Sequence, residues 1–188
     1  MEKNILSTAM DKSFLQEIQL DISKNVNLCY QCKKCTAGCP IIYEMDYTPT
    51  QIIQAVRLGV KDLVLGSKTI WLCASCETCS TRCPQDIDIA GVMDAARIMS
   101  KREGIKPAVN DIPSLHKSFL QIIKMFGRSY ELGLIGLLKL RTKEFTKDLK
   151  LGLKMFRLGK LKIFPQISNT SKVRRIFSKV KKIEQEKK

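Results

Sequence analysis

The sequence predicts a mainly α-helical protein that carries two cysteine-rich loops. Apolar residues recur at helical spacing on both sides of each loop, and helix-capping and helix-stopping residues bracket these stretches. No stretch alternates apolar and polar residues as a strand would. We expect residues 1–104 to form one helical domain and residues 105–188 to form a basic helical extension.

The first expected helix precedes the first cysteine loop. Ser13 and Gln16 have the spacing of a capping box at its start. The apolar residues that follow at helical spacing are Phe14, Leu15, Ile18 and Ile22.

Three further helices are expected around the loops. Between the loops, Thr50 is placed to cap a helix that Gly59 ends, and a second short helix is expected over Lys61–Leu65. The apolar face of the first of these consists of Ile52, Ile53, Ala55, Val56 and Leu58. After the second loop, Ile89–Glu103 repeats the arrangement, with Gly104 as its stop.

Beyond Pro107 and Pro113 the chain becomes basic and rich in leucine. Residues 101–188 carry 23 Lys and Arg against 7 Asp and Glu, whereas residues 1–100 carry 10 against 11, so the net charge of +15 lies in the second half. We expect two or three short helices over Ser114–Phe164. Charged and polar residues dominate Ser168–Lys188, which we expect to be a mobile tail outside a complex. The extension is predicted to dock on an acidic partner.

The sequence has no pattern for export or for a membrane span. Residues 1–21 mix charges among their apolar positions, unlike a signal peptide. The longest nearly apolar run, Leu132–Leu138, is far shorter than the roughly 20 residues that cross a bilayer. We therefore expect a cytoplasmic protein without a transmembrane segment.

All eight cysteines lie in an internal repeat. An offset of 44 residues aligns two copies of the pattern C-x2-C-x2-C-x3-C-P. The first copy contains Cys29, Cys32, Cys35, Cys39 and Pro40; the second contains Cys73, Cys76, Cys79, Cys83 and Pro84. Because thiols stay reduced where there is no export, eight such cysteines point to metal ligands.

The spacing is typical of two 4Fe–4S clusters. In this bacterial two-cluster pattern the fourth cysteine of each copy binds the cluster of the other copy. The first cluster is therefore predicted to bind Cys29, Cys32, Cys35 and Cys83, and the second to bind Cys73, Cys76, Cys79 and Cys39. The proline after each fourth cysteine fixes φ and removes an amide donor, so it directs the chain away from the cluster.

Two other uses of the cysteines compete with this assignment. A zinc site combines two separated C-x2-C pairs, which would leave one cysteine of each triplet unused, and disulfides need an oxidising compartment. The duplicated spacing favours clusters. Lys33, Lys34 and Arg82 lie in or beside the loops, where they either raise a cluster's reduction potential or simply solvate the surface.

The residues in and around both loops include Asn25-Val26, Cys29-Tyr30-Gln31-Cys32-Lys33-Lys34-Cys35-Thr36-Ala37-Gly38-Cys39-Pro40, Ile70-Trp71-Leu72-Cys73 and Cys76-x-Thr78-Cys79-x-x-x-Cys83-Pro84. These residues resemble the C subunit of heterodisulfide reductase from methanogenic archaea. The resemblance covers residues 5–104 and continues more loosely through Gly152–Pro165.

The resemblance implies an α-helical ferredoxin scaffold with two 4Fe–4S clusters, and all eight cysteines match the ligand positions of that family. It implies a non-catalytic electron-relay subunit of an oxidoreductase complex in methanogenesis. Electrons would pass from an A subunit with flavin and clusters to a B subunit that reduces the heterodisulfide of coenzyme M and coenzyme B. The complex would be a larger hetero-oligomer with a hydrogenase or another electron donor. This chain has neither a Cys-Cys doublet nor G-x-G-x-x-G, which assigns the disulfide and flavin chemistry to the partners.

A second function class is a binding module whose clusters only stabilise the fold, while the basic tail contacts nucleic acid or a membrane surface. The extension lacks interleaved aromatic residues and any DNA-reading motif, so we expect no nucleic-acid partner. Leucines and basic residues coexist over Leu132–Phe156, so a helix that lies on a membrane surface stays an alternative for this segment. Salt-sensitive retention on nucleic acid would distinguish the two classes.

Overall fold

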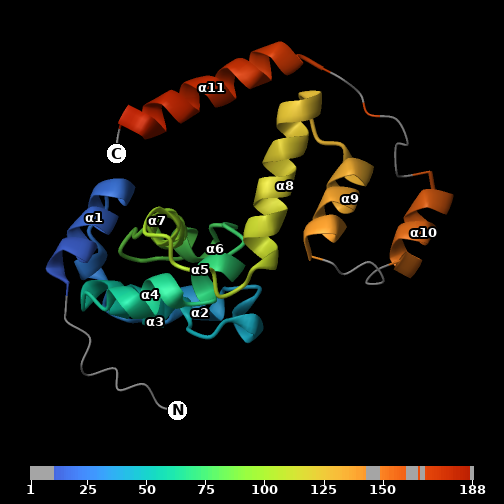
Figure 1. Ribbon diagram of the computed structural model, residues 1–188. Helices are drawn as coiled ribbons and strands as arrows, with labels where there is room; N and C mark the ends of the chain where they lie inside the picture. Colours follow the sequence, from blue (N-terminus) through green and yellow to red (C-terminus); the bar gives the residue numbers. More distant parts are fainter. Residues whose placement is uncertain (1–10, 143–148, 160–164, 166–167, 187–188) are drawn as a thin grey trace. The chain divides into compact units, whose positions relative to one another are not determined.

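The computed structural model describes residues 11–142, 149–159, 165 and 168–186 (Figure 1). These residues form helices and turns and contain no strand, which confirms the predicted mainly α fold class. The chain divides after Asn110 into two compact units. The sequence prediction ended the first domain at Gly104, and the separate roles predicted for the two parts stay a prediction.

The first unit carries its longer helices around the two cysteine loops. These helices are α1 (Lys12–Ile22), α3 (Pro49–Arg57), α4 (Lys61–Gly66) and α7 (Ile89–Arg102). One-turn helices are α2 (Lys34–Ala37), α5 (Thr69–Leu72) and α6 (Thr78–Thr81), and 3-10 turns lie at Val26–Leu28 and Ile42–Glu44. The four longer helices occur where the sequence predicts them.

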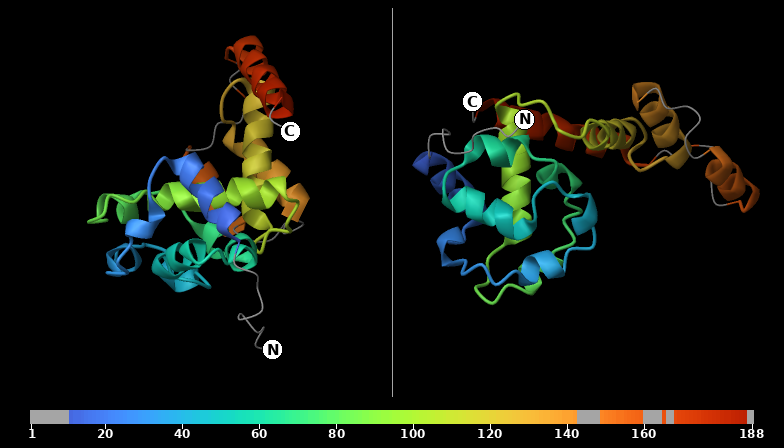
Figure 2. Two further views of the ribbon diagram at one scale, coloured as in Figure 1. Left: turned by 90° about the vertical axis from the view of Figure 1, so that its left-hand side faces the viewer. Right: turned by 90° about the horizontal axis from the view of Figure 1, so that it is seen from below.

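The core of the first unit lies between α7 and the helices that contact it. Helix α7 packs against α1, α3, α4, α5 and α6, and it runs through the middle of this unit in the right-hand view of Figure 2. The most deeply buried large apolar residues of these helices include Phe14, Ile18, Ile52, Ile53, Val56, Val64, Leu65, Ile70, Val92, Met93 and Met99. Burial of each such side chain contributes roughly 1.5–3 kcal/mol, so the loops are attached to a well-packed scaffold.

Helix α1 begins earlier than a cap at Ser13 would allow. The Asp11 carboxylate accepts hydrogen bonds from the amides of Ser13 and Phe14 at 2.8 and 3.3 Å. The predicted capping box at Ser13 was therefore wrong. Aspartate caps as well as serine does, and Asp11 stands two positions ahead.

Helix α3 is capped by Thr48 and not by the predicted Thr50. Thr48 and Gln51 form a capping box, in which each side chain bonds the backbone amide of the other residue. Pro49 occupies the first helical position, where its fixed φ is already helical and its missing amide hydrogen costs nothing. Thr50 lies inside the helix, where its hydroxyl serves the cysteine loop described below.

The described part of the second unit is helical. Its helices are α8 (Asp111–Phe126), α9 (Glu131–Thr142), α10 (Leu149–Arg157) and α11 (Thr170–Glu186). Helix α8 contacts both α9 and α11, and the buried Ser118 hydroxyl of α8 accepts a hydrogen bond of 2.8 Å from Arg141 of α9. The helices expected over Ser114–Phe164 correspond to α8, α9 and α10, with residues 143–148 and 160–164 outside the described part.

Helix α11 was not predicted from the sequence, which led us to expect only a mobile tail from Ser168 onward. Its apolar residues nevertheless recur at helical spacing: Val173, Ile176, Phe177, Val180 and Ile183. The mobility of the tail stays a prediction. Within the described ranges, no helix combines the length and the apolar character that crossing a bilayer requires.

Candidate metal centre

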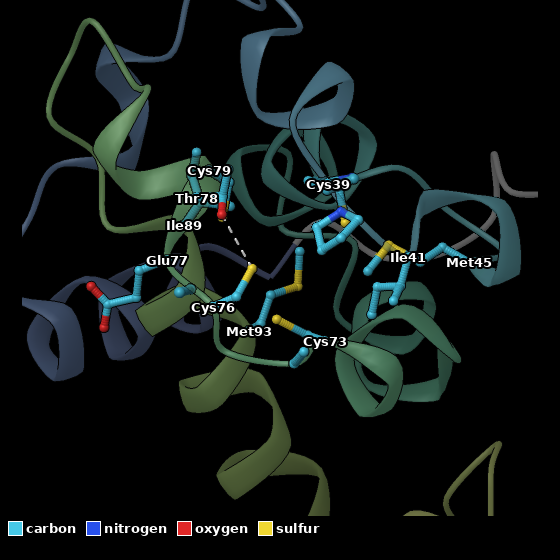
Figure 3. Close-up of a pocket in the computed structure, with 14 residues that line it drawn as sticks. Cys39, Ile41, Met45, Cys73, Cys76, Glu77, Thr78, Cys79, Ile89 and Met93 are labelled. Atoms are coloured by element: carbon cyan, nitrogen blue, oxygen red, sulfur yellow. Dashed lines mark hydrogen bonds between the residues drawn. The ribbon is translucent and has the colours of Figure 1, made fainter.

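Each cysteine loop supplies three cysteines to one pocket and its fourth to the other. We call the two pockets the Cys73 pocket and the Cys29 pocket. The Cys73 pocket is lined by Cys73, Cys76, Cys79 and, from the first loop, Cys39 (Figure 3). The Cys29 pocket is lined by Cys29, Cys32, Cys35 and, from the second loop, Cys83. The structure brings together the two sets of four that the sequence predicts, and their binding of clusters stays a prediction.

The linings of the two pockets differ in charge. Besides apolar residues such as Ile41, Ile89 and Met93, the Cys73 pocket is lined by Glu77 and Thr78 (Figure 3). The Cys29 pocket is lined by Ile53, Ile87 and Ile89 together with Gln31, Lys33, Lys34 and Thr50. Only Ile89 lines both pockets in the described part of the chain, so the pockets are neighbours.

Both loops follow the same unusual backbone path. Gln31 and Ser75, two residues after the first cysteine of each loop, have φ of 60° and 49°. Lys33 and Glu77, one residue after the second cysteine, have φ of 64° and 57°. A left-handed conformation costs a residue other than glycine roughly 1–2 kcal/mol. Lys33 and Glu77 each directly precede a helix, and such a step from a left-handed to a right-handed residue turns successive amides toward one concavity, which suits an anionic ligand.

Burial and hydrogen bonding set the acidity of the thiols in the second loop. Burial raises the pKa of Cys79 to about 11. Burial also raises the pKa of Cys73, against the hydrogen bond from the Ser75 amide and the charge of Arg97. Hydrogen bonding to Thr78 lowers the pKa of the exposed Cys76. Because iron binds thiolates, Cys73 and Cys79 would have to lose their protons to hold a cluster in this pocket.

A hydroxyl next to the third cysteine ties each loop to the helix that follows. Thr36 Oγ1 accepts a hydrogen bond of 3.3 Å from the Thr50 amide, and Ser80 Oγ accepts one of 3.1 Å from the Ala90 amide. Both amides lie at helix starts, where they have no partner within the helix. Thr50 Oγ1 also lies 3.2 Å from Cys35 Sγ. These bonds fix each third cysteine relative to α3 or α7.

The two loops meet at Gly38. Helix α2 of the first loop contacts α6 of the second. A Cβ at position 38 would lie 3.0 Å from a guanidinium nitrogen of Arg82 and 3.4 Å from the carbonyl oxygen of Lys34. The missing side chain lets the residue before Cys39 approach the residue before Cys83. This approach allows each fourth cysteine to reach the pocket of the other loop.

Sequence reasoning missed two arginines behind the loops. Arg57 of α3 donates a hydrogen bond of 2.9 Å to the carbonyl oxygen of Cys29, and Arg97 of α7 donates one of 2.7 Å to that of Cys73. Each arginine thus fixes the first cysteine of a loop. The arginines are 40 residues apart, whereas 44 residues separate the cysteines, so a repeat search built on the cysteines does not align them.

Asp46 fixes the start of the segment that leads to Cys73. Its carboxylate accepts hydrogen bonds of 2.8–3.0 Å from the amides of Tyr47, Lys68 and Thr69 and from the Thr69 hydroxyl. Burial acts to raise the pKa of Asp46, but the bonds from Lys68 and Thr69 outweigh burial and lower it. The start of α5 is therefore capped by a residue from a distant loop.

Replacement of Asp46 by Asn should destabilise the protein by about 1–3 kcal/mol at pH 7. One carboxylate oxygen becomes an NH2 group, which cannot accept a hydrogen bond, so a backbone amide that it faces loses its acceptor. Since the folded-state pKa is lowered, the carboxylate stabilises the fold above the unfolded pKa of about 3.9, and this contribution is lost as the pH falls through the folded value. Anaerobic denaturant unfolding should give Asp46→Asn a lower free energy of unfolding than the wild type at pH 7. The difference between the two free energies should disappear in acid. The exposed Asp21→Asn is the control, and an equal loss in this control would refute the role of Asp46.

The geometry of the pockets suits a group larger than one ion. Within the described residues, no three His, Cys, Asp or Glu side chains are close enough to hold a single metal ion. A cubane cluster binds each thiolate through a different iron, so its ligands lie farther apart. Four thiols line each pocket, yet no three of them lie close enough together for one ion, so the residues fit a four-iron cluster better than a single zinc ion.

Comparison with known proteins agrees with this fit. Residues 28–88 match the 4Fe-4S dicluster domain. The eight cysteines of this segment fit two 4Fe–4S clusters, as the sequence predicts. Fold and site together define a two-cluster iron–sulfur protein.

Part of the chain is similar in sequence to C subunits of heterodisulfide reductases. It is 33% identical over 104 residues to the C subunit of H(2):CoB-CoM heterodisulfide,ferredoxin reductase from Methanothermobacter marburgensis, covering 55% of this chain and 56% of that protein. It is 38% identical over 84 residues to the second C-type iron–sulfur subunit of CoB–CoM heterodisulfide reductase from Methanocaldococcus jannaschii, covering 45% of each. The chain therefore matches about half the length of these relatives. The resemblance predicted from the residues around the loops is confirmed.

Proposed function

We propose that this protein relays electrons through two 4Fe–4S clusters between other subunits of a cytoplasmic heterodisulfide reductase. The observation that carries the proposal is the crossed arrangement of the cysteines around two neighbouring pockets. A bound 4Fe–4S cluster takes up and releases single electrons at a potential that its surroundings set. Two such sites side by side are what an electron relay requires.

The proposal assigns four thiolates to each cluster. Cys29, Cys32, Cys35 and Cys83 hold the first cluster, and Cys73, Cys76, Cys79 and Cys39 hold the second. The left-handed residues of the loops shape the concavity, the arginines hold the first cysteines, and Pro40 and Pro84 direct the chain away. Apolar side chains such as Ile89 and Met93 line part of the Cys73 pocket, whereas Cys76 stays exposed.

The same proposal names the partners. Electrons come from an A-type subunit with flavin and clusters and go to a B-type subunit, which reduces the heterodisulfide of coenzyme M and coenzyme B. The names of the relatives, which are subunits of oxidoreductases, support this assignment. The basic second unit serves as the docking extension, and its helix α11 leaves three large apolar side chains exposed, Ile176, Val180 and Ile183. A hydrogenase or another electron donor completes the hetero-oligomer.

Reconstitution of the full chain with iron and sulfide without air should yield about eight iron atoms per chain, because each cubane holds four. Electron paramagnetic resonance of the reduced protein should show two coupled clusters. A Cys32→Ser, Cys76→Ser double variant treated identically is the control for adventitious iron. Tightly bound zinc without a visible chromophore would refute the assignment.

Purification from native cells without air should recover the A-type and B-type subunits, and their absence would refute the relay.

A further inference from the structure

The two halves of the first unit have loops with similar backbone conformation, each followed by a helix, but they differ in the charges beside these loops. Helices α3 and α7 align at an offset of 40 residues, which pairs Arg57 with Arg97 and Gln54 with Asp94. In each helix the arginine contacts the residue three positions before it. The residue beside the arginine is therefore a neutral amide in one half and a carboxylate in the other.

Arg97 forms an ion pair behind the Cys73 pocket. Its Nη1 lies 3.0 Å from Asp94 Oδ1, and 15% of the Arg97 side chain is exposed against 49% of the Asp94 side chain. The other guanidinium nitrogens donate to the carbonyl oxygens of Ile70 and Cys73. A carboxylate this close cancels much of the field that the guanidinium would exert on the pocket.

Arg57 holds the equivalent place behind the Cys29 pocket without a carboxylate. Its Nη1 donates to the carbonyl oxygen of Cys29 at 2.9 Å and to Gln54 Oε1 at 3.0 Å. Among the described residues no carboxylate pairs with Arg57, and its buried Nε has no hydrogen-bond partner there. A partly buried charge is screened less by salt than an exposed one, so the positive charge of Arg57 acts on the pocket beside it.

The charged residues of the loops also make the surroundings of the Cys29 pocket more positive than those of the Cys73 pocket. Lys33 and Lys34 line the Cys29 pocket, whereas Glu77 and Thr78 occupy the equivalent positions in the Cys73 pocket. Lys33, Lys34 and Glu77 are exposed, so solvent weakens their effect. They reinforce the difference that originates behind the loops.

We propose that Arg57 makes the Cys29 pocket the site of higher reduction potential, and that the Gln54 or Asp94 beside each arginine sets the order of the two potentials. The inference rests on the proposed function, because it assumes a cluster in each pocket. Reduction adds one negative charge, and an uncompensated positive charge nearby favours the reduced state. At equilibrium a single added electron therefore resides mainly in the Cys29 pocket.

The test is a redox titration of the holo-protein with a chemical reductant, followed by electron paramagnetic resonance. Cys32→Ser and Cys76→Ser, which perturb one site each, assign the signals. Gln54→Glu should lower the potential of the Cys29 site, and Asp94→Asn should raise that of the Cys73 site. Each change should alter the equilibrium for reduction about tenfold, which is about 59 mV for one electron. In each variant the other potential should stay unchanged.

Two variants separate charge from position. Arg57→Lys keeps the positive charge and should keep the potential, whereas Arg57→Gln should lower it. Arg102→Gln on α7 removes an exposed arginine that pairs with Glu17, and it should leave both potentials unchanged. A higher potential at the Cys73 site in the wild type, or clusters that bind but do not respond to Gln54→Glu and Asp94→Asn, would overturn the inference. Failure of the wild type to bind clusters would instead refute the proposed function.

Discussion

Replacement of Cys39 by Ser should remove the cluster of the second loop and leave that of the first loop in place. Cys39 belongs to the first loop in sequence but lines the Cys73 pocket in space. The Cys73 pocket then keeps only three thiolates, because a serine hydroxyl does not replace a thiolate well as a ligand of iron. Iron content should fall from about eight to about four atoms per chain, since each cubane carries four.

Cys83→Ser provides the matched control for this prediction. Cys83 belongs to the second loop but lines the Cys29 pocket, so its variant should lose the first cluster and retain the second. The two variants should give different electron paramagnetic resonance spectra that together account for the wild-type signals. Crossed ligation would be contradicted if Cys39→Ser lost the cluster of the first loop and Cys83→Ser lost the cluster of the second.

Removal of iron by a chelator should unfold residues 20–100. The helices inside the loops, α2 and α6, have four residues each and are far too short to be stable alone. The four left-handed residues of the loops impose a further cost that cluster binding offsets. Because cluster binding and folding are coupled, most of the helical circular dichroism of this unit should disappear on chelation.

Hydrogen exchange of the full chain locates the effect. Amides of α3 and α7 should lose protection after chelation, whereas amides of α8, in the second unit, should change little. Anaerobic re-addition of iron and sulfide should restore protection and serves as the control for damage by the chelator. Full helicity in a metal-free sample would contradict the coupling and would show that the apolar core around α7 suffices.

The three cysteines of each loop were predicted to share a site because ligand spacing is a local property of the chain, whereas the crossing of the fourth cysteines was predicted from the known two-cluster pattern. The helices that flank the loops were also predicted, since their apolar periodicity reflects burial against α7. Their caps were less predictable, because Asp11 and Thr48 compete with Ser13 and Thr50 only two positions away. Local sequence cannot decide between such neighbours.

The residues that sequence reasoning missed act through tertiary contacts. Asp46 caps a helix that begins 23 residues later, which no spacing rule anticipates. Arg57 and Arg97 became equivalent only once α3 and α7 were aligned as helices, because the connection to the preceding loop is four residues shorter in the second half. Helix α11 was missed because its density of charge masked its apolar spacing.

The exposure of Cys32 and Cys76 has a chemical consequence for the protein. These are the second cysteines of the two loops, and they are the exposed ones among the eight, whereas Cys35 is buried. An oxidant dissolved in water reaches these two sulfurs before the others. The corners that lie open to an electron-transfer partner are thus the corners at which air would begin to dismantle the clusters.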